Sequence, residues 1–184
     1  MTFAKILADG GNEVVLWARR PDVVDEINED HRNGDYLPGI DLPTSLSATT
    51  DAAVALNGVE QVYIAVPSSS LRANLQAWGS QIPKDAILVS LMKGVEQGTG
   101  LRMSQVIEEV LDWPKGQVAV VSGPNLSAEI AAEHPTASVA ACSKADTAAA
   151  VARACTNDYF TTFTNRDVIG TEFGGILKNL IAVA

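Results

Sequence analysis

A lysine within an apolar segment makes the stretch from 170 to 182 the most informative part of this sequence. Lys178 and Asn179 stand side by side in a run with helical spacing that otherwise contains mostly Leu, Ile, Ala and Gly. Burial of an ammonium group costs several kcal/mol unless the group is paired or neutralised. A helix that only had to pack would carry Leu or Ala there. Lys178 is therefore a candidate acid or base, and a lysine whose head reaches water is the alternative.

Polar residues also follow two apolar strands farther up the chain. Lys93 comes just after the run 87–91, while Gly123 and Asn125 come directly after the run 118–122. In open α/β sheets, ligands bind outside the carboxyl ends of the strands. These three residues are therefore candidates for a ligand site. The alternatives are a solvated lysine at a strand end and an asparagine that caps the next helix.

Two arginines follow the first predicted strand, at 13–17. Arg19 and Arg20 stand where a dinucleotide-binding domain selects its cofactor, and no acidic residue appears before Asp22. An acidic residue at this place would bind the ribose hydroxyls of NAD, whereas an arginine accommodates the 2′-phosphate of NADP. The pattern favours NADP over NAD. Solvated charge ahead of a helix is the alternative.

The elements that must position these residues alternate along the chain. Strands are predicted at 13–17, 46–49, 61–66, 87–91, 118–122, 138–141 and 159–163. Helices are predicted at 2–8, 19–32, 51–56, 68–78, 101–111, 126–133, 145–154 and 167–184. Strands that are apolar on both faces and separated by helices indicate a mostly parallel sheet covered on both sides. The predicted fold class is α/β, with a Rossmann-type, doubly wound sheet.

The start of the sequence departs from a complete nucleotide-binding unit, which begins with a strand and a glycine-rich turn. This chain opens within a helix, and no G-x-G-x-x-G is present. The first strand of such a sheet is normally central, so we expect an open slot between two strands. The chain is predicted to be a fragment, with residues 1–165 as the cofactor domain and 166–184 as the opening of a helical domain.

Composition excludes several classes of function. The formal net charge is −9, and no basic face of the kind that binds nucleic acid is visible. No segment reaches the roughly 20 apolar residues of a membrane span. Cys142 and Cys155 form no metal-binding spacing and are expected to be small buried side chains. No metal is predicted, and the balance suits a cytoplasmic protein kept soluble by its charge.

Three segments in register resemble one family. They are Leu91–Glu96 (LMKGVE), Ser122–Ala131 (SGPNLSAEIA) and Glu172–Asn179 (EFGGILKN). Together they resemble the bacterial NAD(P)-dependent glycerol-3-phosphate dehydrogenases. Thr2–Gly11 is similar to the segment directly after the family's glycine fingerprint, and Leu16–Arg20 is similar to the end of its second strand. The resemblance covers the whole chain.

The resemblance implies a fold, an activity and a set of site residues. The family joins a Rossmann-type domain to an all-helical domain. It interconverts dihydroxyacetone phosphate and sn-glycerol 3-phosphate by hydride transfer with NAD or NADP, which supplies the phospholipid backbone. A homodimer is implied for the full-length protein. By resemblance the acid/base is Lys178, the substrate-binding residues are Lys93, Gly123, Asn125, Lys178 and Asn179, and the cofactor-binding residues are Arg19, Arg20, Lys93, Ser127 and Glu129.

Two other functions remain compatible with parts of the sequence. One is a dehydrogenase of the same two-domain plan that acts on a β-hydroxyacid, since such enzymes also carry a Lys-Asn pair after the sheet. The other is a non-catalytic fragment that binds a nucleotide or assembles with a partner. The segments at 91–96 and 122–131 favour the phosphate substrate over the β-hydroxyacid. The isolated chain is expected to be inactive, because the family's substrate-phosphate clamp is absent from it.

Overall fold

The computed structural model describes the backbone of residues 1–183 and the side chains of residues 1–178. The α-helices and strands are α1 (Thr2–Asp9), β1 (Val14–Trp17), α2 (Pro21–Asp25), β2 (Leu46–Thr49), α3 (Ala52–Ala55), β3 (Gln61–Ile64), α4 (Leu71–Trp78), β4 (Ile87–Ser90), α5 (Met103–Leu111), β5 (Val118–Ser122), α6 (Ser127–Ala131), β6 (Thr136–Ala141), α7 (Ala145–Cys155), β7 (Phe160–Asn165) and α8 (Val168–Val183). A π-helical turn (Glu26–Asp30) and the 3-10 turns Ser68–Ser70, Gly79–Gln81 and Lys115–Gln117 complete the set.

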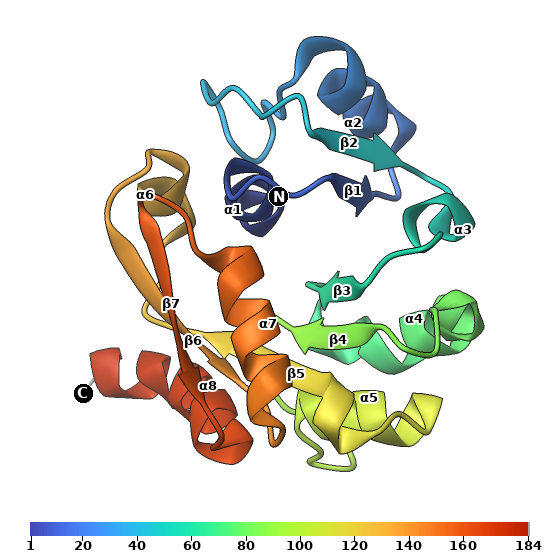
Figure 1. Ribbon diagram of the computed structural model, residues 1–184, viewed down its shortest axis with the longest axis vertical. Coiled ribbons are helices and arrows are strands. Elements are labelled where there is room, and N and C mark those ends of the chain that lie inside the picture. The colour runs from blue at the N-terminus through green and yellow to red at the C-terminus, as the bar shows by residue number, and fades with distance from the viewer. Residues whose placement is uncertain (184) are drawn as a thin grey trace.

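The strands form two sheets (Figure 1). β1 and β2 pair in parallel, and the larger sheet has the order β3-β4-β5-β6-β7. In the larger sheet all neighbours run parallel except β5 and β6, which are antiparallel. The predicted α/β class with a mostly parallel sheet is confirmed. The strands divide between these two sheets.

The division falls between β1 and β3. Each pairs on one side only, β1 with β2 and β3 with β4, and the two strands line one cavity without pairing to each other. Figure 1 shows them facing across the gap beside the N-terminus of the chain. The open slot between two strands that the sequence predicts is therefore confirmed. Its lining carries unpaired strand edges, which are normally covered or paired in folded proteins.

Helices cover both faces of the larger sheet. Leu88 faces a core built with α4 and α5, whereas its neighbour Val89 faces a core built with α1 and α7. Both side chains are fully buried, as alternation on a two-sided sheet requires. Cys142 and Cys155 are also fully buried and free, which confirms their expected packing role. A third core joins α1 and α2 to the small sheet.

Several predicted boundaries shift by a few residues, and one helix is wrong in kind. The predicted helix 19–32 is a short α2 followed by a π-helical turn, and it ends at His31 in a left-handed conformation with φ of 52°. Asp51 caps α3, because its carboxylate accepts a hydrogen bond from the Ala53 amide. These changes alter the rim of the small sheet and leave the order of elements intact.

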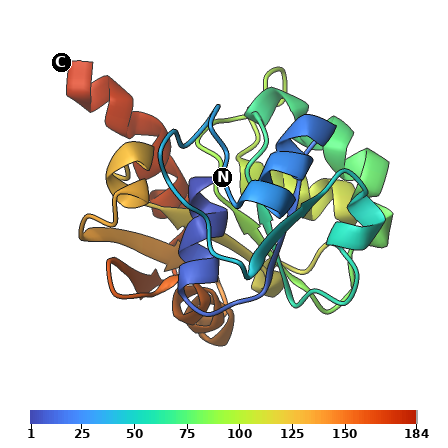
Figure 2. The ribbon, with the colours of Figure 1, turned by 90° about the horizontal axis from the view of Figure 1, so that it is seen from above.

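The terminal helix α8 begins against the larger sheet and then departs from it. Its first turns pack on β5 and β6, and Figure 2 shows its far end projecting from the rest of the chain. In the described part of the chain, no helix combines the length and the apolarity that a bilayer crossing requires. Lys178 lies on α8 just beyond the part that is packed on the sheet.

Candidate active site

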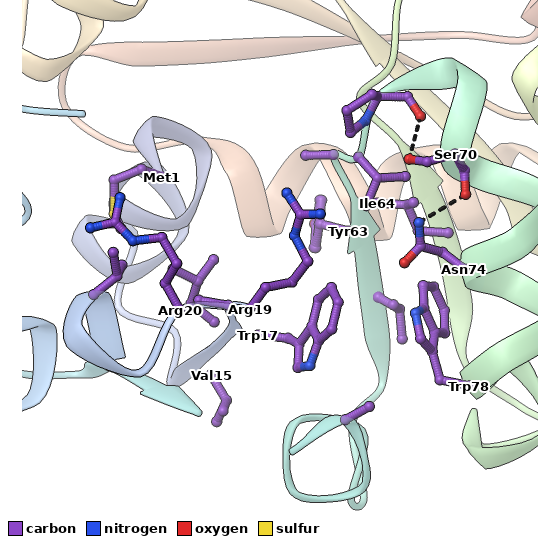
Figure 3. A pocket seen from close by; sticks show the side chains of 18 of the residues that line it. Met1, Val15, Trp17, Arg19, Arg20, Tyr63, Ile64, Ser70, Asn74 and Trp78 are labelled. Atoms are coloured by element: carbon purple, nitrogen blue, oxygen red, sulfur yellow. Dashed lines mark hydrogen bonds between the residues drawn. The ribbon is translucent and has the colours of Figure 1, made fainter. Parts of the chain in front are cut away.

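A cavity of about 560 Å³ lies at the gap between the two sheets (Figure 3). Its walls come from the carboxyl ends of β1 and β3 and from α4. Trp17 and Trp78 form part of the lining. The Trp78 indole nitrogen is buried and makes no hydrogen bond to any described residue. The cavity coincides with the open slot between β1 and β3, and residues that follow the two strands, Ala18–Arg20 and Ala65–Pro67, also line it.

The two arginines at the rim of this cavity differ in their partners. Arg20 makes ion pairs with Asp22 and with Asp35, the second at 2.7 Å between Nη1 and Oδ2. These carboxylates raise the pKa of the Arg20 guanidinium above its ordinary value, chiefly through the hydrogen bond to Asp22. Arg19 is exposed and makes no ion pair with the residues that the structure describes. Of these two arginines, Arg19 is therefore the one whose charge is open to a ligand.

A second group of candidate residues lies away from this cavity, at the ends of β4 and β5. Lys93 follows β4, and its ammonium group donates a hydrogen bond of 3.0 Å to the carbonyl oxygen of Gly123, which follows β5. Parallel neighbouring strands bring these two loops to the same edge of the sheet. The structure thus joins two segments that the sequence only placed in similar positions. Neither residue lines the 560 Å³ cavity.

The pKa of Lys93 is lowered from its ordinary value. Partial burial of its ammonium end is the main cause, followed by the charge and hydrogen bonding of Lys178. The residue as a whole is exposed, so its contact with the Gly123 carbonyl leaves the ammonium group open to solvent and to a ligand. Gly175, three residues before Lys178 on α8, lies against the Lys93 side chain, so α8 carries Lys178 toward Lys93. Lys178 itself is half-buried and not enclosed.

Helix α8 lies close to the end of β5, and this explains why Lys178 comes near Lys93. A Cβ atom at Gly175 would overlap the Ser122 hydroxyl at the end of β5 and would lie 3.5 Å from the Lys93 Cγ. Glycine at this position therefore lets the helix backbone settle against the strand end. Lys178 comes three residues later, which is just under one helical turn. The glycine thus sets how near the second lysine can come to the first.

The turn after β5 places Asn125 beside Gly123. A Cβ atom at Gly123 would lie 2.8 Å from the Ala137 carbonyl oxygen and 3.0 Å from the Asn125 Oδ1. The expected capping role of Asn125 is wrong, because α6 begins two residues later and Leu126 occupies the N-cap position. Asn125 Oδ1 is buried and has no hydrogen-bond partner among the described residues. A buried acceptor without a partner is costly and is a common mark of a ligand site.

The remaining candidate residues belong neither to the lining of the cavity nor to the group after β4 and β5. Ser127 and Glu129 are exposed on α6, and neither lines the cavity. The side chain of Asn179 lies outside the described residues. Within those residues, no cluster of three or more His, Cys, Asp or Glu side chains could hold a metal ion.

Comparison with known proteins places these features in a family. The family described as "NAD-dependent glycerol-3-phosphate dehydrogenase N-terminus" matches residues 1–148. The chain belongs to this family. A glycerol-3-phosphate dehydrogenase (NAD(P)+) of Leifsonia xyli subsp. xyli is 59% identical over 183 residues, which are 100% of this chain and 50% of that relative. That of Corynebacterium jeikeium is 52% identical over 183 residues, which are 100% of this chain and 55% of that relative.

Solved structures of other family members match the fold closely. Glycerol-3-phosphate dehydrogenase of Coxiella burnetii superposes with a TM-score of 0.88 at 32% identity, covering 99% of this chain and 55% of that one. The Plasmodium falciparum glycerol-3-phosphate dehydrogenase gives 0.90 at 26% identity, covering 99% of this chain and 53% of that one. The chain therefore spans about half the length of the family members that it matches.

One buried cluster in this family member has no counterpart in the sequence predictions. Glu172, near the start of α8, is only 4% exposed, yet it carries a carboxylate. It makes an ion pair with Arg102 and accepts hydrogen bonds from the Ser104 amide at 3.0 Å and the Ser104 hydroxyl at 2.6 Å. An acidic residue within an apolar helical run was the available signal. The sequence could not supply its partners, which are separated from it by 68 and 70 residues.

Proposed function

We propose that the full-length protein interconverts dihydroxyacetone phosphate and sn-glycerol 3-phosphate with NAD or NADP. The observation that carries this proposal is that α8 lies against Lys93 at Gly175, while Lys93 is bonded to Gly123, whose loop also holds the unpartnered Asn125 oxygen. Reduction of a ketone requires a hydride at the carbon and a proton at the oxygen. The bound nicotinamide would supply the hydride. The residues of this chain must orient the ketone and supply the proton.

Lys178 is proposed to give its proton to the ketone oxygen as the hydride reaches the carbon, and to take it back in the reverse direction. Lys93 lies close enough to hold the developing negative charge on that oxygen, since its ammonium end is near both Lys178 and the Gly123 carbonyl. Asn125 and Gly123 are proposed to position the substrate hydroxyls, and Asn179 to join them. Fixed charges around a partly desolvated site stabilise a transition state more than they would in water.

The residues that follow β1 and β3, at one end of the slot between the two strands, are the proposed place for part of the cofactor. They stand at the carboxyl ends of the strands, where dinucleotides bind in this kind of fold. Arg19, free of ion pairs with the described residues, would meet the 2′-phosphate of NADP, so we propose NADP as the preferred cofactor. Arg20 is proposed to stay beside it, held by its two carboxylates. Ser127 and Glu129 are proposed to lie on the cofactor side of the substrate.

The same proposal covers the domains of the chain, the location of the full-length protein and its oligomeric state. Residues 1–165 form the cofactor domain, and 166–184 begin a helical domain that completes the substrate site. The full-length protein is proposed to be a cytoplasmic homodimer that supplies a phospholipid precursor. The isolated chain is proposed to be inactive, because precise positioning of substrate accounts for many kcal/mol of a catalysed barrier.

A grafted enzyme provides the test. It consists of the Leifsonia xyli relative with its matching 183 residues replaced by those of this chain. We expect NADPH-dependent reduction of dihydroxyacetone phosphate and no oxidation of β-hydroxyacids such as 3-hydroxyisobutyrate. Folded grafted enzyme that oxidises the β-hydroxyacid and ignores dihydroxyacetone phosphate would contradict the proposal. The isolated 184-residue chain, assayed alongside, should show no turnover of either substrate.

A further inference from the structure

The buried cluster around Glu172 connects the two segments that carry the lysines. Glu172 belongs to α8, five residues into the helix, and Lys178 lies farther along the same helix. Arg102 and Ser104 lie at the start of α5, at the far end of the loop that begins with Lys93. The two carboxylate oxygens of Glu172 divide their contacts, Oε1 to the Ser104 amide and Oε2 to the Ser104 hydroxyl and Arg102. One side chain thus ties α8 to the end of the Lys93 loop.

The loop from Lys93 to Arg102 is also held by other contacts. Arg72 makes a bidentate contact with Glu96, with nitrogen–oxygen distances of 2.8 and 2.9 Å. An isolated bridge pairs Val95 with Arg102 across the loop. The loop therefore does not adjust freely between Lys93 and Arg102. A shift at the Arg102 end is passed to the Lys93 end through a short, braced segment.

Helix α8 is fixed at two points ahead of Lys178. The first is the Glu172 cluster, and the second is the contact of Gly175 with Ser122 and Lys93. Two fixed points along a helix define its direction as well as its position. The direction decides where the Lys178 side chain reaches. A change at Glu172 alone removes the polar anchor and leaves only the packing of α8 on the sheet, including the Gly175 contact, to set the direction of the helix.

We propose that Arg102, Ser104 and Glu172 are positioning residues that set the spacing between Lys93 and Lys178. This inference rests on the proposed function, in which that spacing is part of the chemistry. Burial of an ion pair is seldom the most stabilising choice for a core position, because apolar residues of similar size often do as well. Its advantage here is geometric. A bidentate carboxylate accepts from fixed donors at one place, whereas packed apolar side chains tolerate small shifts.

The main test is Glu172→Gln in the grafted enzyme. The amide keeps the size of the side chain but cannot satisfy the same three donors and leaves Arg102 without its counter-charge. We expect kcat for dihydroxyacetone phosphate to fall about tenfold to a hundredfold, as small misplacements of reacting groups can do. The KM for NADPH should stay within about twofold. In addition, ¹³C-dimethyl-lysine spectra should show Lys93 titrating at higher pH, because Lys178 no longer lies as close.

Two further variants make the result specific. Glu108→Gln on α5 removes one negative charge that acts on Arg102, and the Glu108 carboxylate makes no hydrogen bond to α8 within the described residues. It should keep kcat within about twofold. Arg102→Lys keeps one cation facing Glu172, so it should lose less activity than Glu172→Gln. Its kcat should fall between those of Glu172→Gln and the unchanged grafted enzyme. It also serves as the decisive variant if Glu172→Gln does not fold.

The outcomes separate this inference from the proposed function. If the variants melt at lower temperature but keep kcat and the titration of Lys93, the cluster only stabilises the fold and the inference is overturned. If the unchanged grafted enzyme folds but reduces no dihydroxyacetone phosphate, the proposed function fails. The titration of Lys93 still decides the spacing in that case, because it requires no turnover.

Discussion

Two regions of this chain carry a lysine whose pKa departs from its ordinary value, and they depart in opposite directions. Lys5 of α1 is 3% exposed and pairs with Asp9 at 2.6 Å and Glu133 at 2.9 Å. Burial by itself would lower the pKa of Lys5, but its hydrogen bonds to the two carboxylates outweigh burial and raise the pKa. Lys93 has a carbonyl and a second lysine for neighbours, and its pKa falls.

The difference lies in the partners and not in the depth of burial. Lys5 is more deeply buried than either Lys93 or Lys178, and its charge is neutralised twice over. Its ammonium also lies 5.3 Å from the centre of the Tyr159 ring. A lysine in that setting holds elements together, since α1 and the end of α6 meet through it. A lysine without carboxylates has proton-transfer chemistry open to it.

Replacement of Lys178 should have the largest effect of any change in the comparison. If Lys178 is the acid and base, Lys178→Ala in the grafted enzyme removes the proton donor and should lower kcat by about 10²- to 10⁴-fold. Steady-state reduction of dihydroxyacetone phosphate at saturating NADPH measures this. A variant that keeps its kcat removes the acid/base assignment.

Replacement of Lys93 tests the other member of the pair. Lys93→Met removes a cation and its hydrogen bond to the Gly123 carbonyl, while it keeps most of the side-chain volume. A charge-assisted hydrogen bond in such a site is worth about 1.5–3 kcal/mol, so kcat/KM should fall roughly ten- to a hundredfold. Kinetics with dihydroxyacetone phosphate as the varied substrate give this value. An unchanged kcat/KM would mean that Lys93 is an ordinary solvated lysine.

Arg19 and Arg20 show the same contrast, since Arg20 is paired with two aspartates and Arg19 makes no ion pair with the described residues. Arg19→Asp should reduce the preference for NADPH over NADH by about tenfold, the equivalent of one charge-assisted hydrogen bond of about 1.5 kcal/mol. Arg20→Gln should change that preference little, because Arg20 is already engaged by two aspartates. The ratio of kcat/KM values for the two cofactors is the measurement. Equal effects of both substitutions would break the distinction.

Replacement of Lys5 should affect stability and leave turnover unchanged. Lys5→Met leaves Asp9 and Glu133 without their shared cation, and we expect a loss of about 2 kcal/mol in the free energy of unfolding at pH 7. Because folding raises the pKa of Lys5, its contribution is complete below the ordinary value of 10.5 and is lost as the pH rises through the folded-state value. Urea unfolding at pH 7 gives the loss. A large fall in kcat in a normally folded variant would contradict a structural role.

The smallest effect expected is an acid dependence of the loop that carries Lys93. The hydrogen bonds from Arg72 are the main reason that the pKa of Glu96 falls to about 2. A carboxyl with a lowered pKa contributes stability above its ordinary value of 4.5, and this is lost as the pH falls toward 2. Glu96→Gln should therefore melt below the unchanged grafted enzyme at pH 7, with a smaller difference at pH 3. A pH-independent difference would show that the ion pair is not its cause.

Most of the fold could be predicted from local patterns. The run Val118–Ser122 is apolar almost throughout, as a central strand with two covered faces requires, and all five residues are buried. The gap beside β1 could also be predicted, since the order of elements lacks the usual central first strand. The antiparallel β5–β6 pair could not, because strand pairing depends on contacts between distant segments.

The candidate site, like the fold, could be predicted from the sequence only in part. Motifs in register singled out Lys93, Gly123, Asn125 and Lys178, and their roles stay predictions until they are tested. The sequence could not tell that Asn125 leaves its oxygen unpaired among the described residues instead of capping α6. It also assigned no role to Glu172, whose partners come from the distant start of α5.

The sequence by itself determined the class of fold, the family and the side chains available for chemistry, because these depend on residue types and on their spacing over short ranges. Only the tertiary structure decided which cations are neutralised and which are free. Lys5 has one carboxylate, Asp9, four residues farther along its own helix, and the sequence alone shows that pair, whereas Glu133 lies 128 residues away and only the fold brings it to Lys5. The two carboxylates make Lys5 a structural residue, whereas the charge that acts between α8 and the Lys93 loop is that of a second lysine.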